Sequence, residues 1–170
     1  MSIISFIKDA GEKLFGHTTA AKTPSAAPAA PADTAPLQAQ AGQANDAAAQ
    51  AIQKYIAAQN LSADGLTVQY DGSQQAVTVS GVAPDQSTKE KIVLCCGNVQ
   101  GVAKVNDLLT VQQPADESRY YTVVSGDTLS AIAKKEYGNA NQYMKIFEAN
   151  KPMLSNPDKI YPGQLLRIPA

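Results

Sequence analysis

Few side chains in this sequence have the types and spacing that catalysis or metal binding requires. The single histidine, His17, has no partner near it in the sequence for a metal site or a catalytic dyad. Asp127 and Asp158 occupy positions typical of turns and helix caps, where a carboxylate binds main-chain amides. The glycine-rich signatures of phosphate and dinucleotide sites are absent from the sequence. We therefore expect a binding protein without catalytic or cofactor-binding residues, and not an enzyme.

The two cysteines, Cys95 and Cys96, are adjacent in the sequence. A disulfide between neighbours is strained and cannot join two elements, and the CxxC spacing of redox and zinc sites is missing. We expect two small, buried or half-buried thiols near the end of a helix, which fits a reducing compartment.

Composition excludes some classes of partner. The net charge is −1 over 170 residues, and this balance gives no basic surface for nucleic acid. No apolar run approaches the roughly 20 residues of a transmembrane helix. At the N-terminus the apolar run ends at Ile7 with no basic region before it, and residue 2 is serine rather than glycine. The sequence thus predicts a cytoplasmic protein without a signal peptide, a transmembrane segment or a myristoyl group.

The apolar spacing of residues 3–15 predicts an amphipathic helix within residues 1–16. It would pack on a domain; binding to a membrane surface is less favoured because its polar face has mixed charge. Residues 17–44 are mostly Ala, Pro, Gln and Thr, and they predict a disordered linker.

Residues 45–111 predict a compact unit with the order αββαβ. Asn45 or Asp46 would cap a first helix, whose apolar face is Ala48, Ile52, Tyr55 and Ile56. Alternating apolar residues on both sides of Asp71-Gly72 indicate a hairpin. Pro84 and Asp85 open a second helix, in which Ser87 and Glu90 have capping-box spacing. Gly97 would end that helix, before a strand over about 102–111.

After a hinge at 112–118, residues 119–170 predict a second unit with the order βααβ. A strand leads to a turn at Ser125-Gly126-Asp127, where Asp127 would cap a helix over 128–137 that Gly138 ends. A second helix carries Tyr143, Ile146 and Phe147, and a Pro162-Gly163 turn precedes the last strand. The fold class is therefore α+β, in two domains.

These segments resemble known families. The stretch VTVSGVAPDQSTKEKIVLCCGNVQGVAKVNDLLTV resembles a BON domain, and YTVVSGDTLSAIAKKEYG, IFEANKPML and IYPGQLLRIP resemble a LysM domain. Together with the start FIKDAGEKLF, the chain resembles the bacterial cytoplasmic BON–LysM potassium-binding proteins. The Ala/Pro-rich stretch after Gly16 departs from that pattern. The resemblance implies a cytoplasmic sensor or buffer of potassium ion, whose BON domain is ordered by the ion and closes against LysM.

A potassium site need not contain charged side chains, because rings of main-chain carbonyls can hold the ion. Carbonyls are available where helices end, and glycines there permit close approach. We hypothesise one ion held by the main-chain oxygens of Ile7, Ala10, Gly97, Val99 and Val102. The alternative is an ordinary helix stop followed by a loop.

Two other functions compete with potassium binding. LysM domains bind N-acetylglucosamine polymers such as peptidoglycan, and the resemblance places a groove at Gly126, Asp127, Thr128, Leu129, Asn150, Pro152, Met153 and Ile160. The LysM domain could instead bind its own BON neighbour or another protein. BON domains also associate with membrane surfaces, although the near-neutral charge argues against this.

Overall fold

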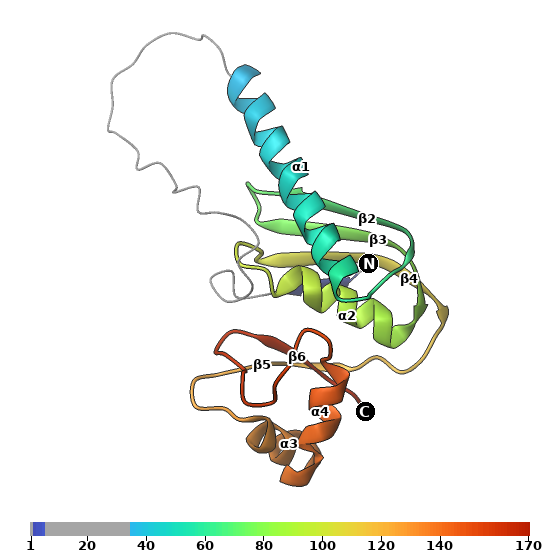
Figure 1. The fold of residues 1–170 in the computed structure, drawn as a ribbon, viewed down its shortest axis with the longest axis vertical. Coiled ribbons are helices and arrows are strands. Elements are labelled where there is room, and N and C mark those ends of the chain that lie inside the picture. The colour runs from blue at the N-terminus through green and yellow to red at the C-terminus, as the bar shows by residue number, and fades with distance from the viewer. Residues whose placement is uncertain (1, 6–34) are drawn as a thin grey trace.

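The computed structural model describes residues 2–5 and 35–170, which form two units of mixed helix and strand. Figure 1 shows the first unit, in which two helices lie in front of three long strands, and the smaller second unit, which lies below the second of those helices. The α+β class and both predicted element orders, αββαβ and βααβ, are confirmed.

The first unit contains α1 (Ala35–Ala58), β2 (Asp64–Asp71), β3 (Ala76–Asp85), α2 (Gln86–Gly97) and β4 (Lys104–Gln113). With β1 (Ser2–Ser5) included, the sheet order is β1-β4-β3-β2, so β3 lies in the middle of the three long strands. β2 and β3 form the predicted antiparallel hairpin, whereas β3 and β4 are parallel, with Val77 opposite Val105. A parallel pair requires a crossover, and α2 supplies it.

Both helices pack on one face of this sheet and enclose the core (Figure 1). The predicted inner face of α1 is confirmed, since Ala48, Ile52 and Ile56 are buried. Cys95 and Cys96 are fully buried free thiols at the end of α2, also as predicted. Their burial raises the pKa of Cys95 to about 12 and that of Cys96 well above its usual value.

The N-terminal helix prediction is wrong over residues 2–5. These residues form the strand β1 (Ser2–Ser5), which pairs antiparallel with β4 from Ser2–Asp107 to Ser5–Lys104. The run SIIS contains two adjacent β-branched isoleucines, which favour strand, and β4 offers a free edge. The rest of that prediction, residues 6–16, lies outside the described residues, as does His17.

The disordered linker was predicted to extend too far. Helix α1 begins at Ala35, ten residues before the expected cap. Its first turns, APLQAQAGQA, are rich in strong helix formers and have proline at the second position, where no amide donor is needed. Asn45 therefore lies inside the helix, and its side chain accepts a hydrogen bond from the Gly72 amide instead (3.1 Å). The part of the predicted linker over 17–34 lies outside the described residues.

Helix α2 is capped two positions earlier than a Ser87–Glu90 box would require. Asp85 is the N-cap, and its carboxylate accepts from the Thr88 amide (2.8 Å) and the Thr88 hydroxyl (3.0 Å). Glu90 is thereby left available for contacts outside its own helix.

The second unit contains β5 (Arg119–Thr122), α3 (Leu129–Tyr137), the 3-10 turn η1 (Ala140–Gln142), α4 (Tyr143–Ala149) and β6 (Leu165–Ile168). β5 and β6 pair antiparallel, and the two helices pack around a core that includes Ile132, Ile146 and Ile168. The predicted helix stop at Gly138 is confirmed by its left-handed φ of 74°.

The cap of α3 is Thr128, not Asp127, because the Thr128 hydroxyl accepts from the Ala131 amide at 3.2 Å. Asp127 instead closes the preceding turn. Its carboxylate accepts from the Tyr121 hydroxyl and the Val124 amide, each at 3.0 Å.

Candidate functional site

Three of the five predicted ligand residues lie in residues 97–102, hereafter the 97–102 segment, which leads from α2 to β4. Gly97 is the last residue of α2, and the Asn98 amide continues the helical pattern by donating to the Leu94 carbonyl (2.9 Å). The predicted end of the helix at Gly97 is confirmed, although Gly97 is not among the glycines with positive φ. Val99 and Val102 are fully buried and belong to the core of the first unit, whereas Gln100 and Gly101 between them are half-buried.

The segment contains a tight turn from Val99 to Val102. The Val102 amide donates to the Val99 carbonyl at 3.1 Å, and Gly101 between them has a φ of +96°, which favours glycine. One predicted ligand oxygen therefore already accepts a hydrogen bond. A carbonyl oxygen has two lone pairs, so this one bond is compatible with an ion at the Val99 oxygen.

Two contacts attach this turn to the β2–β3 hairpin. The Tyr70 hydroxyl donates to the Gly101 carbonyl at 3.1 Å, and burial raises the pKa of Tyr70, with a smaller contribution from the charge of Asp71. Directly after the turn, the Ala103 and Lys104 amides both donate to the Gln75 carbonyl (2.7 and 3.2 Å). These bonds hold the Gly101 carbonyl and the start of β4 against the hairpin.

The remaining predicted ligands, Ile7 and Ala10, lie outside the described residues. The strand before them is described: β1 ends at Ser5, which pairs with Lys104, two residues beyond Val102. The described residues include no group of three or more His, Cys, Asp or Glu side chains that could hold a metal ion.

Sequence reasoning missed the side chain inside the segment that reaches the second unit. Asn98 is 7% exposed, and its amide makes two hydrogen bonds to the main chain of Leu165 in β6. Its nitrogen donates to the Leu165 carbonyl and its oxygen accepts from the Leu165 amide, both at 3.0 Å. No local pattern distinguishes a buried asparagine of this kind from one at an ordinary helix end.

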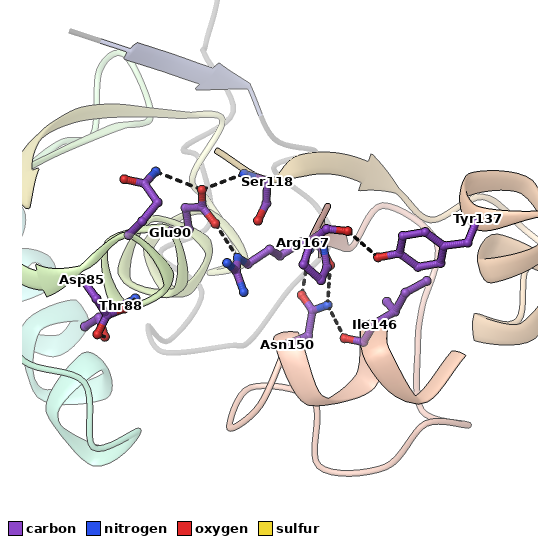
Figure 2. A network of polar contacts seen from close by, with 10 residues as sticks. Asp85, Thr88, Glu90, Ser118, Tyr137, Ile146, Asn150 and Arg167 are labelled. Atoms are coloured by element: carbon purple, nitrogen blue, oxygen red, sulfur yellow. Dashed lines mark hydrogen bonds and ion pairs between the residues drawn. The ribbon is translucent and has the colours of Figure 1, made fainter. Parts of the chain in front are cut away.

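A second group missed from the sequence surrounds Glu90, and Figure 2 shows it between α2 and β6. Glu90 is buried, with only 2% of its surface exposed. Its carboxylate accepts hydrogen bonds from the Gln86 side chain, the Ser118 amide (2.9 Å) and the Arg167 guanidinium. Burial alone would raise the pKa of Glu90, but these hydrogen bonds outweigh it and hold the pKa below its usual value. The carboxylate is therefore charged and paired at neutral pH.

The eight predicted groove residues do not form a uniform surface. Gly126, Thr128 and Pro152 are exposed, whereas Leu129 and Asn150 are buried. Asn150 uses its amide within the unit, donating to the Ile146 and Arg167 carbonyls and accepting from the Arg167 amide, each at 2.8 Å (Figure 2). Leu129 belongs to the core of the second unit, against which the half-buried Ile160 packs. Groove roles for Leu129 and Asn150 thus conflict with their packing.

Met153, from the same set, faces the first unit. It packs against that unit's core cluster and lines a cavity of about 210 Å³. Tyr55 and Asn98 of the first unit line this cavity together with the second-unit residues Met153, Leu154, Ser155, Lys159, Tyr161 and Gln164. The loop after α4 therefore contributes to the boundary between the units.

Comparison with known proteins matches each unit to a domain family. Residues 42–113 match the BON domain model and residues 121–169 match the LysM domain model. The potassium binding protein Kbp of Escherichia coli O6:H1 is 44% identical over 171 aligned residues, which cover 99% of each chain. The chain belongs to the Kbp family. Both predicted resemblances are thereby confirmed.

Two other relatives are similar to only part of this chain. An uncharacterized protein of Deinococcus radiodurans is 45% identical over 83 residues, which cover 42% of this chain and 32% of the relative. The uncharacterized protein YqbP of Bacillus subtilis is 40% identical over 58 residues, covering 29% of this chain and 26% of the relative. Within the described part of the chain, no helix is both long and apolar enough to cross a membrane.

Proposed function

We propose that this chain binds one potassium ion through the main-chain carbonyls of Ile7, Ala10, Gly97, Val99 and Val102, as a non-enzymatic sensor or buffer in the cytoplasm. The observation that carries the proposal is the full-length similarity to a protein named for potassium binding. The two free thiols at Cys95 and Cys96 are compatible with a reducing compartment.

The geometry of the 97–102 segment supports the choice of ligands. Its turn is built on a glycine with positive φ, and its contacts with Tyr70 and Gln75 restrain the main chain around that turn. Such preorganisation lowers the cost of gathering neutral oxygens around a weakly attracted, singly charged ion.

The position of β1 supports the inclusion of the N-terminal ligands. Because Ser5 pairs with Lys104, the last residue of β1 lies beside the start of β4. Ile7 follows two residues later and Ala10 five residues later, and a chain spans at most about 3.3–3.6 Å per residue. Both carbonyls are therefore within reach of the 97–102 segment, and the ion would tie the N-terminal segment to the BON domain.

The direct test is a titration of the full chain, labelled with ¹³C at its carbonyl carbons, with potassium chloride and with sodium chloride. We expect the carbonyl resonances of Ile7, Ala10, Gly97, Val99 and Val102 to shift together at one midpoint, with potassium far more effective than sodium. Saturable potassium binding that leaves these five carbonyls unmoved would reject the ligand set. Absence of saturable binding would reject the function.

A matched pair of glycine variants tests the turn. Gly101→Ala places a side chain at a φ of +96°, and Gly65→Ala does so at +64°; a methyl group finds no atom closer than 3.8 Å at either position. Each should cost about 1 kcal/mol of stability, typical of left-handed strain. Calorimetric titration should show weaker potassium binding for Gly101→Ala, and unchanged affinity for Gly65→Ala. Equal affinities would remove the turn from the site.

A further inference from the structure

The edge of β6 that faces away from β5 is closed by two asparagine side chains. In this antiparallel pair, alternate residues of β6 direct their main-chain groups away from β5, and Leu165 and Arg167 are such residues. Asn150 of the LysM domain binds both main-chain groups of Arg167 at 2.8 Å. Asn98 of the BON domain binds both main-chain groups of Leu165 at 3.0 Å in the same manner. The LysM strand is therefore completed by a residue of the other domain.

That residue lies between two of the proposed ligands. The Gly97 carbonyl belongs to the peptide group that joins Gly97 to Asn98, and Val99 is the next residue along the chain. A side chain held by two hydrogen bonds cannot rotate without breaking them. The two bonds between the Asn98 side chain and Leu165 therefore also restrain the main chain of Asn98. The contact is buried, and leaving its groups unpaired would cost more than an exposed contact of the same kind.

A second contact keeps the domains in this arrangement. Glu90, two helical turns before Asn98 on α2, binds Arg167 of β6 and the Ser118 amide at the end of the interdomain connection. Helix α2 is thus held against β6 at two points, one of which is inside the 97–102 segment.

We infer that Asn98 is a positioning residue through which the LysM domain sets the affinity of the potassium site. This inference rests on the proposed function and adds that strand β6 of the LysM domain contributes to the affinity of the site. A docked LysM domain holds the Gly97 and Val99 carbonyls in their binding directions, and by linkage the ion strengthens the docking of LysM by the same factor.

The test compares potassium affinities of full-length chains by calorimetry. Asn98→Ala should weaken binding about tenfold, within the usual range of coupling between sites. Asn141→Ala, which alters an exposed LysM asparagine on the 3-10 turn, is the control and should bind like the wild type. Unchanged affinity in Asn98→Ala, with tight binding by the wild type, would overturn the inference and leave the proposed function intact. A wild type that does not bind potassium would instead reject the function.

A second variant decides the matter if Asn98→Ala does not fold. The double variant Glu90→Gln/Arg167→Met loosens the other contact, and neither residue lies in the 97–102 segment. Weaker potassium binding supports the inference, and wild-type affinity contradicts it.

Amide resonances separate positioning from a merely structural role. In the wild type the Leu165 amide should shift with potassium at the same midpoint as the 97–102 segment. In Asn98→Ala the segment should still respond at higher potassium, while Leu165 no longer does. A Leu165 response that persists in this variant would show that the coupling takes another route.

Discussion

At the scale of single residues, buried polar side chains form the hydrogen bonds along the edge of β6 and between the two domains. Asn98, Asn150 and Glu90 are each almost fully buried, and each has hydrogen-bond partners that satisfy it. A buried polar group without partners is costly, so such residues specify one arrangement of their surroundings. Glu90 differs from the two asparagines because its side chain is charged.

Glu90 should make stability depend on acidity. Its pKa is lowered in the folded state, so its contribution is complete above the unfolded-state pKa of about 4.3 and is lost as the pH falls through the folded-state value. At pH 7, Glu90→Gln should cost about 2 kcal/mol, the size of a hydrogen bond to a charged group. The difference from the wild type, measured by urea unfolding, should shrink as the pH falls from 5 to 3.

The control for this prediction is Glu148→Gln, whose carboxylate pairs with Lys151 on the surface. An exposed pair of this kind contributes little, so this variant should follow the wild type at every pH. A Glu90→Gln deficit that stays constant from pH 7 to pH 3 would contradict the assignment of a charged Glu90.

At the scale of elements, helix α2 has three structural roles. It provides the crossover between two parallel strands, its end begins the 97–102 segment, and one side of it meets the LysM domain. Its start is defined by the Asp85 cap, which satisfies an amide that the helix itself cannot.

Removing that cap should destabilise the BON domain. Asp85→Ala should cost about 1 kcal/mol of unfolding free energy, as is usual for an N-cap. Asp116→Ala, in the exposed connection between the domains, is the matched control and should have no measurable effect. Urea unfolding followed by circular dichroism checks both, and equal midpoints for Asp85→Ala and the wild type would show that the cap does not contribute.

Periodicity predicted most elements of both domains because their core faces repeat regularly, as at Ile52 and Ile56 of α1. Prediction failed where a local motif competed with a tertiary partner. Glu90 has capping-box spacing but binds Arg167, 77 residues away, and residues 2–5 follow a helical pattern but pair with β4. Around the proposed ligands, the sequence indicated that glycine permits close approach of the main chain, whereas it did not indicate the partner of Asn98, 67 residues away.

At the scale of the whole molecule, the two thiols report whether the BON domain is open. Cys95 and Cys96 are buried, and their raised pKa values keep them as unreactive thiols in the folded state. At pH 8 we expect a thiol reagent to label the native chain slowly and the urea-unfolded chain at once.

Potassium should slow this labelling further, because a ligand that binds the closed state makes opening rarer. At 100 times the dissociation constant, labelling should be about 100-fold slower than without the ion. Sodium chloride at equal ionic strength is the control. Identical rates in the two salts would contradict a link between the ion and the BON core.

The pairing of β1 with β4 has a consequence during protein synthesis. Ser2–Ser5 leaves the ribosome about 100 residues ahead of its neighbour in the sheet, which includes Lys104–Asp107. At about 5–20 residues per second, this delay is about 5–20 s. During that interval β3 also lacks its parallel neighbour, so the nascent BON domain has an open sheet edge. The domain therefore closes in one late step, and nascent chains arrested before residue 104 should remain sensitive to protease and retained by chaperones.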